Sequence, residues 1–151
     1  MESVFKTWKT SRRLVAAFFD NYSIEQLNKA PAGFSNNLIW NIGHVIAAQQ
    51  SLIYRLGNQP MLISEELFNT YKTGSKPTGQ TTAAEAEELK HLLTALIEPT
   101  EKDFYSGKFV TFTERTTTTG FHLGNLNDAL EFNNYHEGLH LGFMMNIRKF
   151  V

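Results

Sequence analysis

Apolar residues recur at helical spacing in four stretches of the chain. They run from about Ser3 to Asn21, from Ser35 or Asn36 to Leu56, from Thr82 to near Pro99, and from Leu126 or Asn127 to Phe150. Repeats of this period place the apolar side chains on one face of a helix. The pattern therefore predicts an all-α protein, an antiparallel four-helix bundle whose helices are joined by long crossover loops.

Local signals set the ends of these helices. Thr82 followed by Glu85 forms a capping box, and Pro99 should end or kink the third helix. The last helix is expected to bury one stripe of its surface, formed by Ala129, Phe132, His136, Leu139, His140, Phe143 and Ile147.

Two connections are long for a small domain. Residues 58–80 contain several Pro and Gly and one brief helical patch from Ser64 to Tyr71. Residues Lys108 to Phe121 alternate threonine with apolar residues, which indicates a short hairpin or an extended loop. Connections of this length are usually functional or cover something. Residue patterns give no role for the loops 58–80 and 106–125.

Composition limits the function classes. The 151 residues, with no linker or repeat, fit one domain spanning 1–151. A net charge of −1 gives no footprint for nucleic acid or an anionic membrane. The chain has no cysteine, which excludes disulfides, cysteine zinc sites and a cysteine nucleophile. No signal peptide or membrane span is evident, so a cytoplasmic location is expected.

The pair His136 and His140 carries the chemical signal. Histidines four residues apart lie on one helix face and can share a metal ion. With Glu137 the run matches H-E-x-x-H, the zinc metalloprotease signature. However, no His, Asp, Glu or Cys follows His140, so a third ligand must come from upstream. The protease hypothesis weakens for this reason.

His44 is the best upstream candidate. It lies in the middle of the second helix among Gly43, Ala47 and Ala48, which leave room beside its ring. The alternative is a core histidine whose ring is hydrogen-bonded to a backbone carbonyl or to Asn41. His91 fits a boundary or surface position, and His122 is either a substrate contact, a fourth ligand or simply exposed.

Glu137 points about 100° away from His136 around the helix. It is either the general base that acts on a metal-bound water, or a carboxylate that is solvated or supports the metal ligands from outside. Asn41, Ser51 and Asn133 are further candidates for groups that support the metal ligands.

These residues together resemble the DinB-like (YfiT-like) family of metal-dependent enzymes. The resemblance rests on Trp40-Asn-Ile-Gly-His44, on Phe68 and Gly74-Ser75-Lys76-Pro77 in the crossover, and on Tyr135-His136-Glu-Gly-Leu-His140-Leu-Gly142. It implies a four-helix bundle with a metal held by His44, His136 and His140. A glutamine frequent in the family after the last glycine is replaced here by Phe143.

The resemblance implies a thiol S-transferase or isomerase that uses a low-molecular-weight thiol such as bacillithiol, mycothiol or glutathione. A three-histidine site would equally suit a hydrolase. Zinc or nickel is the expected ion, with iron as a further choice. The alternative is a non-catalytic binding or stress-related bundle stabilised by its metal. The expected partners are a small-molecule substrate and a second copy in a homodimer, and neither nucleic acid nor a membrane.

Overall fold

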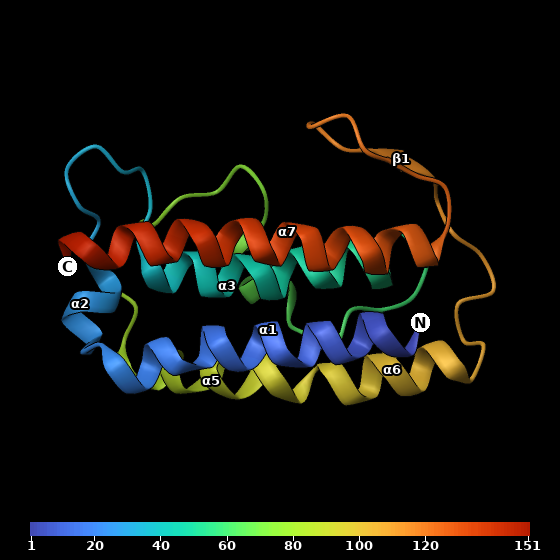
Figure 1. Cartoon of the computed structure of the whole chain (residues 1–151), viewed down its shortest axis with the longest axis horizontal. Helices are drawn as coiled ribbons and strands as arrows, with labels where there is room; N and C mark the ends of the chain where they lie inside the picture. The colour runs from blue at the N-terminus through green and yellow to red at the C-terminus, as the bar shows by residue number, and fades with distance from the viewer.

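The structure is a computed structural model that describes residues 1–151. Four long helical segments form a bundle (Figure 1), namely α1 (Glu2–Asn21), α3 (Leu38–Gln49) continued by a π-helical turn (Gln50–Arg55), α5 (Ala83–Ala95) with α6 (Ile97–Tyr105), and α7 (Leu126–Ile147). The smaller elements are α2 (Ile24–Asn28), α4 (Glu65–Tyr71), the antiparallel strands β1 (Arg115–Thr116) and β2 (His122–Leu123), and a 3-10 turn (Arg148–Phe150). No helix is both long enough and apolar enough to cross a membrane.

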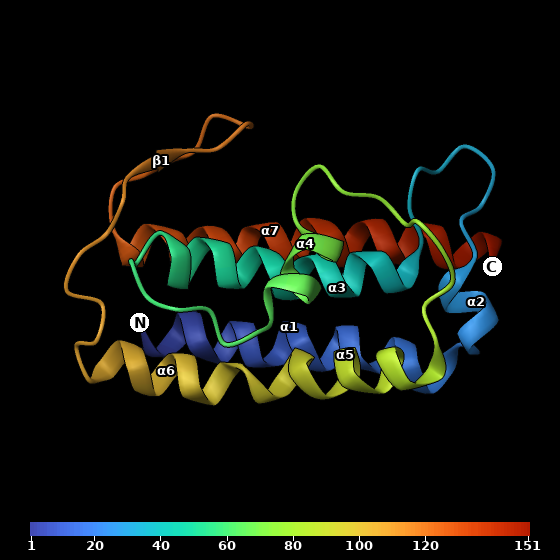
Figure 2. The ribbon, with the colours of Figure 1, turned by 180° about the vertical axis from the view of Figure 1, so that it is seen from behind.

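The apolar pattern predicts an antiparallel bundle, but two pairs of neighbouring segments run parallel. Helix α1 packs against α5 and α7, and α3 packs against the same two helices. Figure 1 shows that α1 and α7 begin at the same end of the bundle and run in the same direction, as do α3 and α5. The cause is the connection after α3, which returns along the whole bundle (Figure 2) before α5 begins. A connection of that length permits parallel neighbours, which a tight turn does not.

Capping residues fix where the helices begin. Thr82 caps α5 through a capping box, as predicted, and Asn125 caps α7 by accepting from two backbone N–H groups. The interruption predicted near Pro99 is present, although Pro99 itself lies inside a helix. The helix breaks at Leu96, and α6 then takes Pro99 into its first turn, where a missing N–H costs no helical hydrogen bond.

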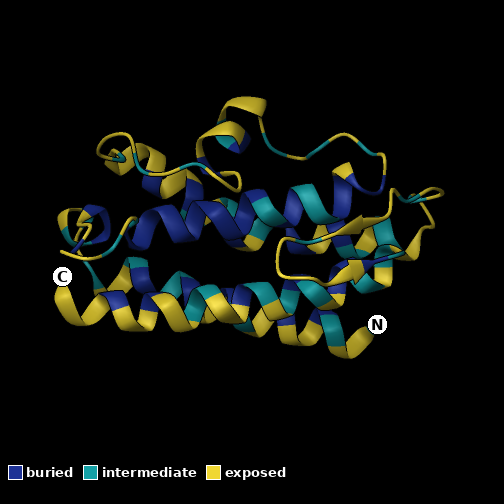
Figure 3. Ribbon diagram, turned by 90° about the horizontal axis from the view of Figure 1, so that it is seen from above, coloured by how far each residue is buried: buried dark blue, intermediate teal, exposed yellow.

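The core face of α7 differs from the predicted stripe. Leu139 and Phe143 are exposed, whereas Asn133 and Glu137 are fully buried. Figure 3 shows buried, intermediate and exposed positions next to one another along the long helices. Because the two buried residues Asn133 and Glu137 are polar, the pattern of apolar residues indicated the wrong face of α7 as the core face. His136 and His140 are therefore half-buried at the edge between the core and the surface, where a ligand can reach them.

Candidate metal centre

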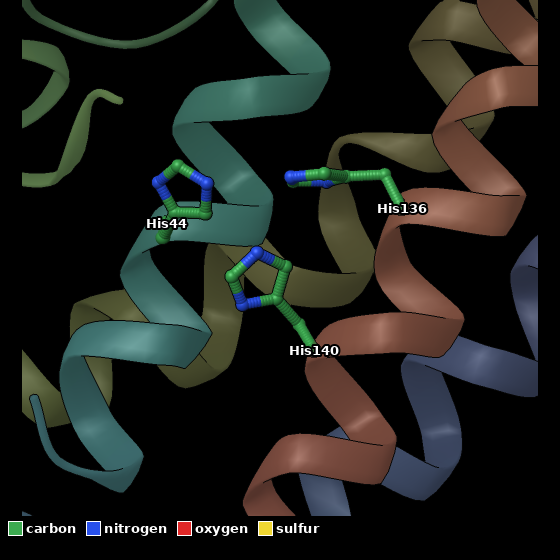
Figure 4. A group of neighbouring side chains, drawn as sticks. All are labelled: His44, His136 and His140. Atoms are coloured by element: carbon green, nitrogen blue, oxygen red, sulfur yellow. The ribbon is translucent and has the colours of Figure 1, made fainter. Parts of the chain in front are cut away.

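Helices α3 and α7 bring three histidines together. Each of His44, His136 and His140 offers one ring nitrogen, and these nitrogens lie within 4.8 Å of one another. Figure 4 shows the three rings converging across the gap between the two helices. The structure thus assembles the three-histidine cluster that the sequence and the resemblance predicted.

His44 is held by the crossover that follows α3. Its Nδ1–H donates to the Tyr71 carbonyl oxygen at 2.7 Å. A carbonyl can only accept, so the proton sits on Nδ1 and the lone pair of Nε2 is free for a ligand. The close approach depends on Gly43, because a Cβ there would lie 2.5 Å from Tyr71 Cγ.

Trp40 fixes the plane of the His44 ring. The two rings stack with centroids 4.8 Å apart and planes 11° from parallel. The indole is itself anchored, since Trp40 Nε1 donates to Ser75 Oγ at 3.2 Å and Ser75 Oγ donates to the Thr70 carbonyl at 2.7 Å. The tryptophan and serine of the family pattern therefore act together on the orientation of His44.

Asn41 orients His140 in the same way. His140 Nδ1–H donates to Asn41 Oδ1 at 2.8 Å. The amide orientation is fixed because Asn41 Nδ2 donates to the Asn37 carbonyl and to Asn36 Oδ1. The expectation that Asn41 supports a ligand is confirmed, and Nε2 of His140 also faces the cluster with its lone pair free.

His136 is the least restrained of the three. One of its ring nitrogens points into the space between His44 and His140 (Figure 4), while Nδ1 is buried without a hydrogen-bond partner. The nitrogen that faces the other two rings could bind an ion, whereas Nδ1 would gain no partner from that ion.

The environment keeps all three imidazoles neutral. Burial lowers the pKa of His44. Burial, followed by the charge of neighbouring histidines, lowers the pKa of His136 to about 4 and that of His140 to about 3. A metal ion needs the neutral form, so the cluster is ready to bind at neutral pH without first losing protons.

The spacing fits a single ion after a small adjustment. With Zn–N bonds of about 2.1 Å, two nitrogens on one ion can be no more than about 4.2 Å apart. The nitrogens span up to 4.8 Å, so the widest pair would have to close by at least about 0.6 Å. The donor set, three neutral imidazoles with two of them hydrogen-bonded through Nδ1, is a recurrent way of holding zinc, nickel or iron.

A cavity of about 240 Å³ opens beside two of the three rings, those of His44 and His136. Ala48 of α3 and Ser51 of the π-helical turn line it, and the hairpin formed by β1 and β2 contributes Arg115 and Thr117 to Thr119. The hairpin confirms the predicted strand pairing between residues 108 and 121 only in part, because β2 begins at His122.

Glu137 lies on another face of α7. Its carboxylate accepts from Arg12 Nε at 2.8 Å, Arg12 Nη2 at 2.7 Å and Trp8 Nε1 at 2.8 Å. Asn133 Nδ2 donates to the same carboxylate at 2.9 Å. Both carboxylate oxygens are thus engaged between α1 and α7 with no exposure to solvent, and the structure does not bring Glu137 to the histidine cluster.

The other two histidines lie apart from the cluster. His91 is exposed on α5, and His122 on β2 is exposed with Nε2 3.6 Å from Glu114. Neither belongs to the group of side chains that could share an ion.

Sequence reasoning missed two contributors to the site. The Tyr71 carbonyl is invisible to side-chain patterns, and only the glycine before His44 hints at a close neighbour. Arg115 and Thr117 to Thr119 line the cavity from a hairpin more than a dozen residues before His136. The concentration of threonine in that loop was the one available signal.

The comparison with known families decides what kind of protein this is. The sequence model of the DinB superfamily matches residues 7–144, a range that includes all three histidines. The chain belongs to the DinB superfamily. Its mostly helical bundle is the arrangement expected of that family, and the resemblance inferred from the motifs is confirmed. No curated protein matches the chain in sequence.

Proposed function

We propose that this DinB superfamily member is a metal-dependent enzyme whose three histidines hold a divalent ion next to a small-molecule pocket. The observation that carries the proposal is the cluster itself, three ring nitrogens within 4.8 Å with two tautomers set by hydrogen bonds. Zinc or nickel is the favoured ion, and iron is compatible with the same donors.

Three neutral imidazoles leave the full +2 charge on a bound ion, which lowers the pKa of a water or thiol placed beside it. The residues of the chain supply orientation. Tyr71 and Asn41 keep the proton of each ring on Nδ1, and Trp40 holds the plane of His44. The hairpin adds Arg115 and Thr117 to Thr119 to the wall of the cavity.

The absence of a carboxylate base from the cavity favours thiol transfer over hydrolysis. No Asp or Glu lines it, and Glu137 is engaged with Arg12. The ion must lower the pKa of water from about 15.7 to near 7 before the water ionises, whereas a thiol begins near 8.5 and needs a much smaller shift. A thiol therefore loses its proton beside the ion without a carboxylate base, and we propose a low-molecular-weight thiol S-transferase.

The alternative is a metal that only clamps α3 to α7. The cavity beside His44 and His136 supports the catalytic role, because a structural site is usually closed around its ion. The buried ion pair between Arg12 and Glu137 and the apolar core already join α7 to the bundle.

Metal analysis of the purified protein tests the proposal, with His136→Ala as the disrupted variant. His91→Ala is the matched control, because this histidine is exposed and outside the cluster. We expect one ion per chain in wild type and in His91→Ala, loss of the ion in His136→Ala, and consumption of a small thiol with a model electrophile only in the loaded proteins. No ion in wild type would refute the metal site, and a bound ion that raises only the melting temperature would favour the clamp.

A further inference from the structure

The cavity beside the histidines contains a single charged side chain. Arg115 lines it, together with hydroxyl-bearing residues and several apolar groups. No Asp, Glu or Lys contributes to its wall. The hydroxyl-bearing members are Ser51, Thr73, Thr117, Thr118, Thr119 and Tyr135.

The hairpin keeps Arg115 in this wall. Arg115 pairs with Leu123 across the two strands, and Leu123 is buried. Beyond the turn, the ring of Phe121 packs against the rings of Phe132 and Tyr135, with centroids 5.2 and 5.0 Å apart. These contacts attach the hairpin to α7 and place its arginine beside the helix that carries His136.

The guanidinium of Arg115 is not committed to the protein. The chain has five ion pairs of Lys or Arg with Asp or Glu, and none of them includes Arg115. Its acidic neighbour, Glu114, faces His122 instead. A free guanidinium presents a planar set of donors that matches a carboxylate.

The charges at the site all have the same sign. Arg115 carries +1, the proposed ion carries +2, and neutral imidazoles remove none of that charge. Since no acid lines the cavity, its potential is positive and attracts anions. Its volume of about 240 Å³ equals that of about eight waters at about 30 Å³ each, so it accommodates a small ligand or one end of a larger one.

We infer that Arg115 determines specificity by binding the carboxylate of a small ligand whose other end, a thiol, faces His44 and His136. A carboxylate pairs with a single guanidinium through two parallel hydrogen bonds, and the flanking hydroxyls can donate to it as well. This inference rests on the proposed metal site and adds the chemical class of the ligand to it.

Thiol binding to the cobalt-loaded protein tests the inference. Two probes of similar size differ in charge: 3-mercaptopropionate carries a carboxylate, and 3-mercapto-1-propanol carries a neutral hydroxyl. Each is titrated while the thiolate-to-cobalt charge-transfer absorbance is followed, so that the readout does not depend on turnover. The variants are Arg115→Ala, Arg115→Lys and the control Arg13→Ala, which removes the same charge from an exposed position outside the cavity.

We expect the preference for 3-mercaptopropionate over the alcohol to fall about tenfold in Arg115→Ala. Direct chelation of cobalt by the carboxylate would persist in both proteins and therefore cancels in this comparison. Arg115→Lys should keep part of the preference and Arg13→Ala all of it. An unchanged preference in Arg115→Ala, with cobalt still bound, overturns the inference and leaves the metal site standing. Failure of wild type to bind cobalt overturns the metal site and this inference with it.

Discussion

Gly43→Ala is the substitution that separates the orientation of His44 from general stability most sharply. A methyl group at this position would lie 2.5 Å from Tyr71 Cγ and 2.6 Å from Cε1. Carbon atoms in contact normally stay about 3.5–4.0 Å apart, so α4 must retreat by about an ångström. That movement would stretch the 2.7 Å hydrogen bond from His44 Nδ1–H to the Tyr71 carbonyl beyond bonding distance.

The expected cost has two parts. Overpacking should lower the free energy of unfolding by about 1–3 kcal/mol. Loss of a group that orients a metal ligand typically lowers metal affinity by about 10–100-fold. Gly57→Ala is the matched control, because its methyl would also meet a crowded site, 2.6 Å from Phe109 Cδ1, without touching a histidine.

The assay is competition for zinc against a chromophoric chelator, with urea unfolding of the metal-free proteins in parallel. We expect both variants to be destabilised, and only Gly43→Ala to lose metal affinity. In the double variant Gly43→Ala with Tyr71→Ala, the ring is gone and the carbonyl remains, so metal affinity should partly return although stability falls further. Equal metal affinity in Gly43→Ala, Gly57→Ala and wild type would refute the reasoning.

Three further predictions concern other groups around the site. Asn41→Leu removes the acceptor of His140 and should lower zinc affinity about 10–100-fold in the same competition assay, while Asn41→Asp keeps an acceptor; equal losses in both would contradict this role. The pKa of His136 falls to about 4 and that of His140 to about 3, mainly through burial, whereas an unfolded histidine titrates near 6.5. Between about pH 6.5 and 4 the unfolded chain therefore binds more protons than the folded chain, and the melting temperature of the metal-free protein should fall as the pH is lowered. The fall should be less steep in His136→Ala; parallel profiles for the two proteins would argue against this. Glu137→Gln leaves Arg12 buried without its counter-charge and should cost about 3–5 kcal/mol in chemical denaturation with the ion still bound, whereas lost turnover at unchanged stability would restore a catalytic role to Glu137.

The sequence predicted the elements better than their packing. Periodicity and capping signals located the long helices, because these depend on neighbouring residues. The direction of neighbouring helices depends on where a long crossover leads, which no local pattern records. The core face of α7 was misjudged because Asn133 and Glu137 are polar, and their burial makes sense only with Arg12 and Trp8 from α1 beside them.

For the site too, the residues could be predicted from the sequence better than their three-dimensional contacts. Two histidines at helical spacing and a third on another helix could be recognised from residue types alone. The carbonyl of Tyr71 and the guanidinium of Arg115 reach the site through tertiary folding of the two long loops. The residue types alone do not show which parts of these loops come close to the histidines. Assembly into a homodimer and the location in the cell stay predictions.

The most direct test of the account is a crystal structure of the metal-loaded protein with anomalous scattering measured at the absorption edge of the ion. We predict one peak, bound by His44, His136 and His140, with at least one coordination position open toward the cavity lined by Arg115. An ion bound elsewhere, or a fourth protein ligand closing the site, would contradict the account.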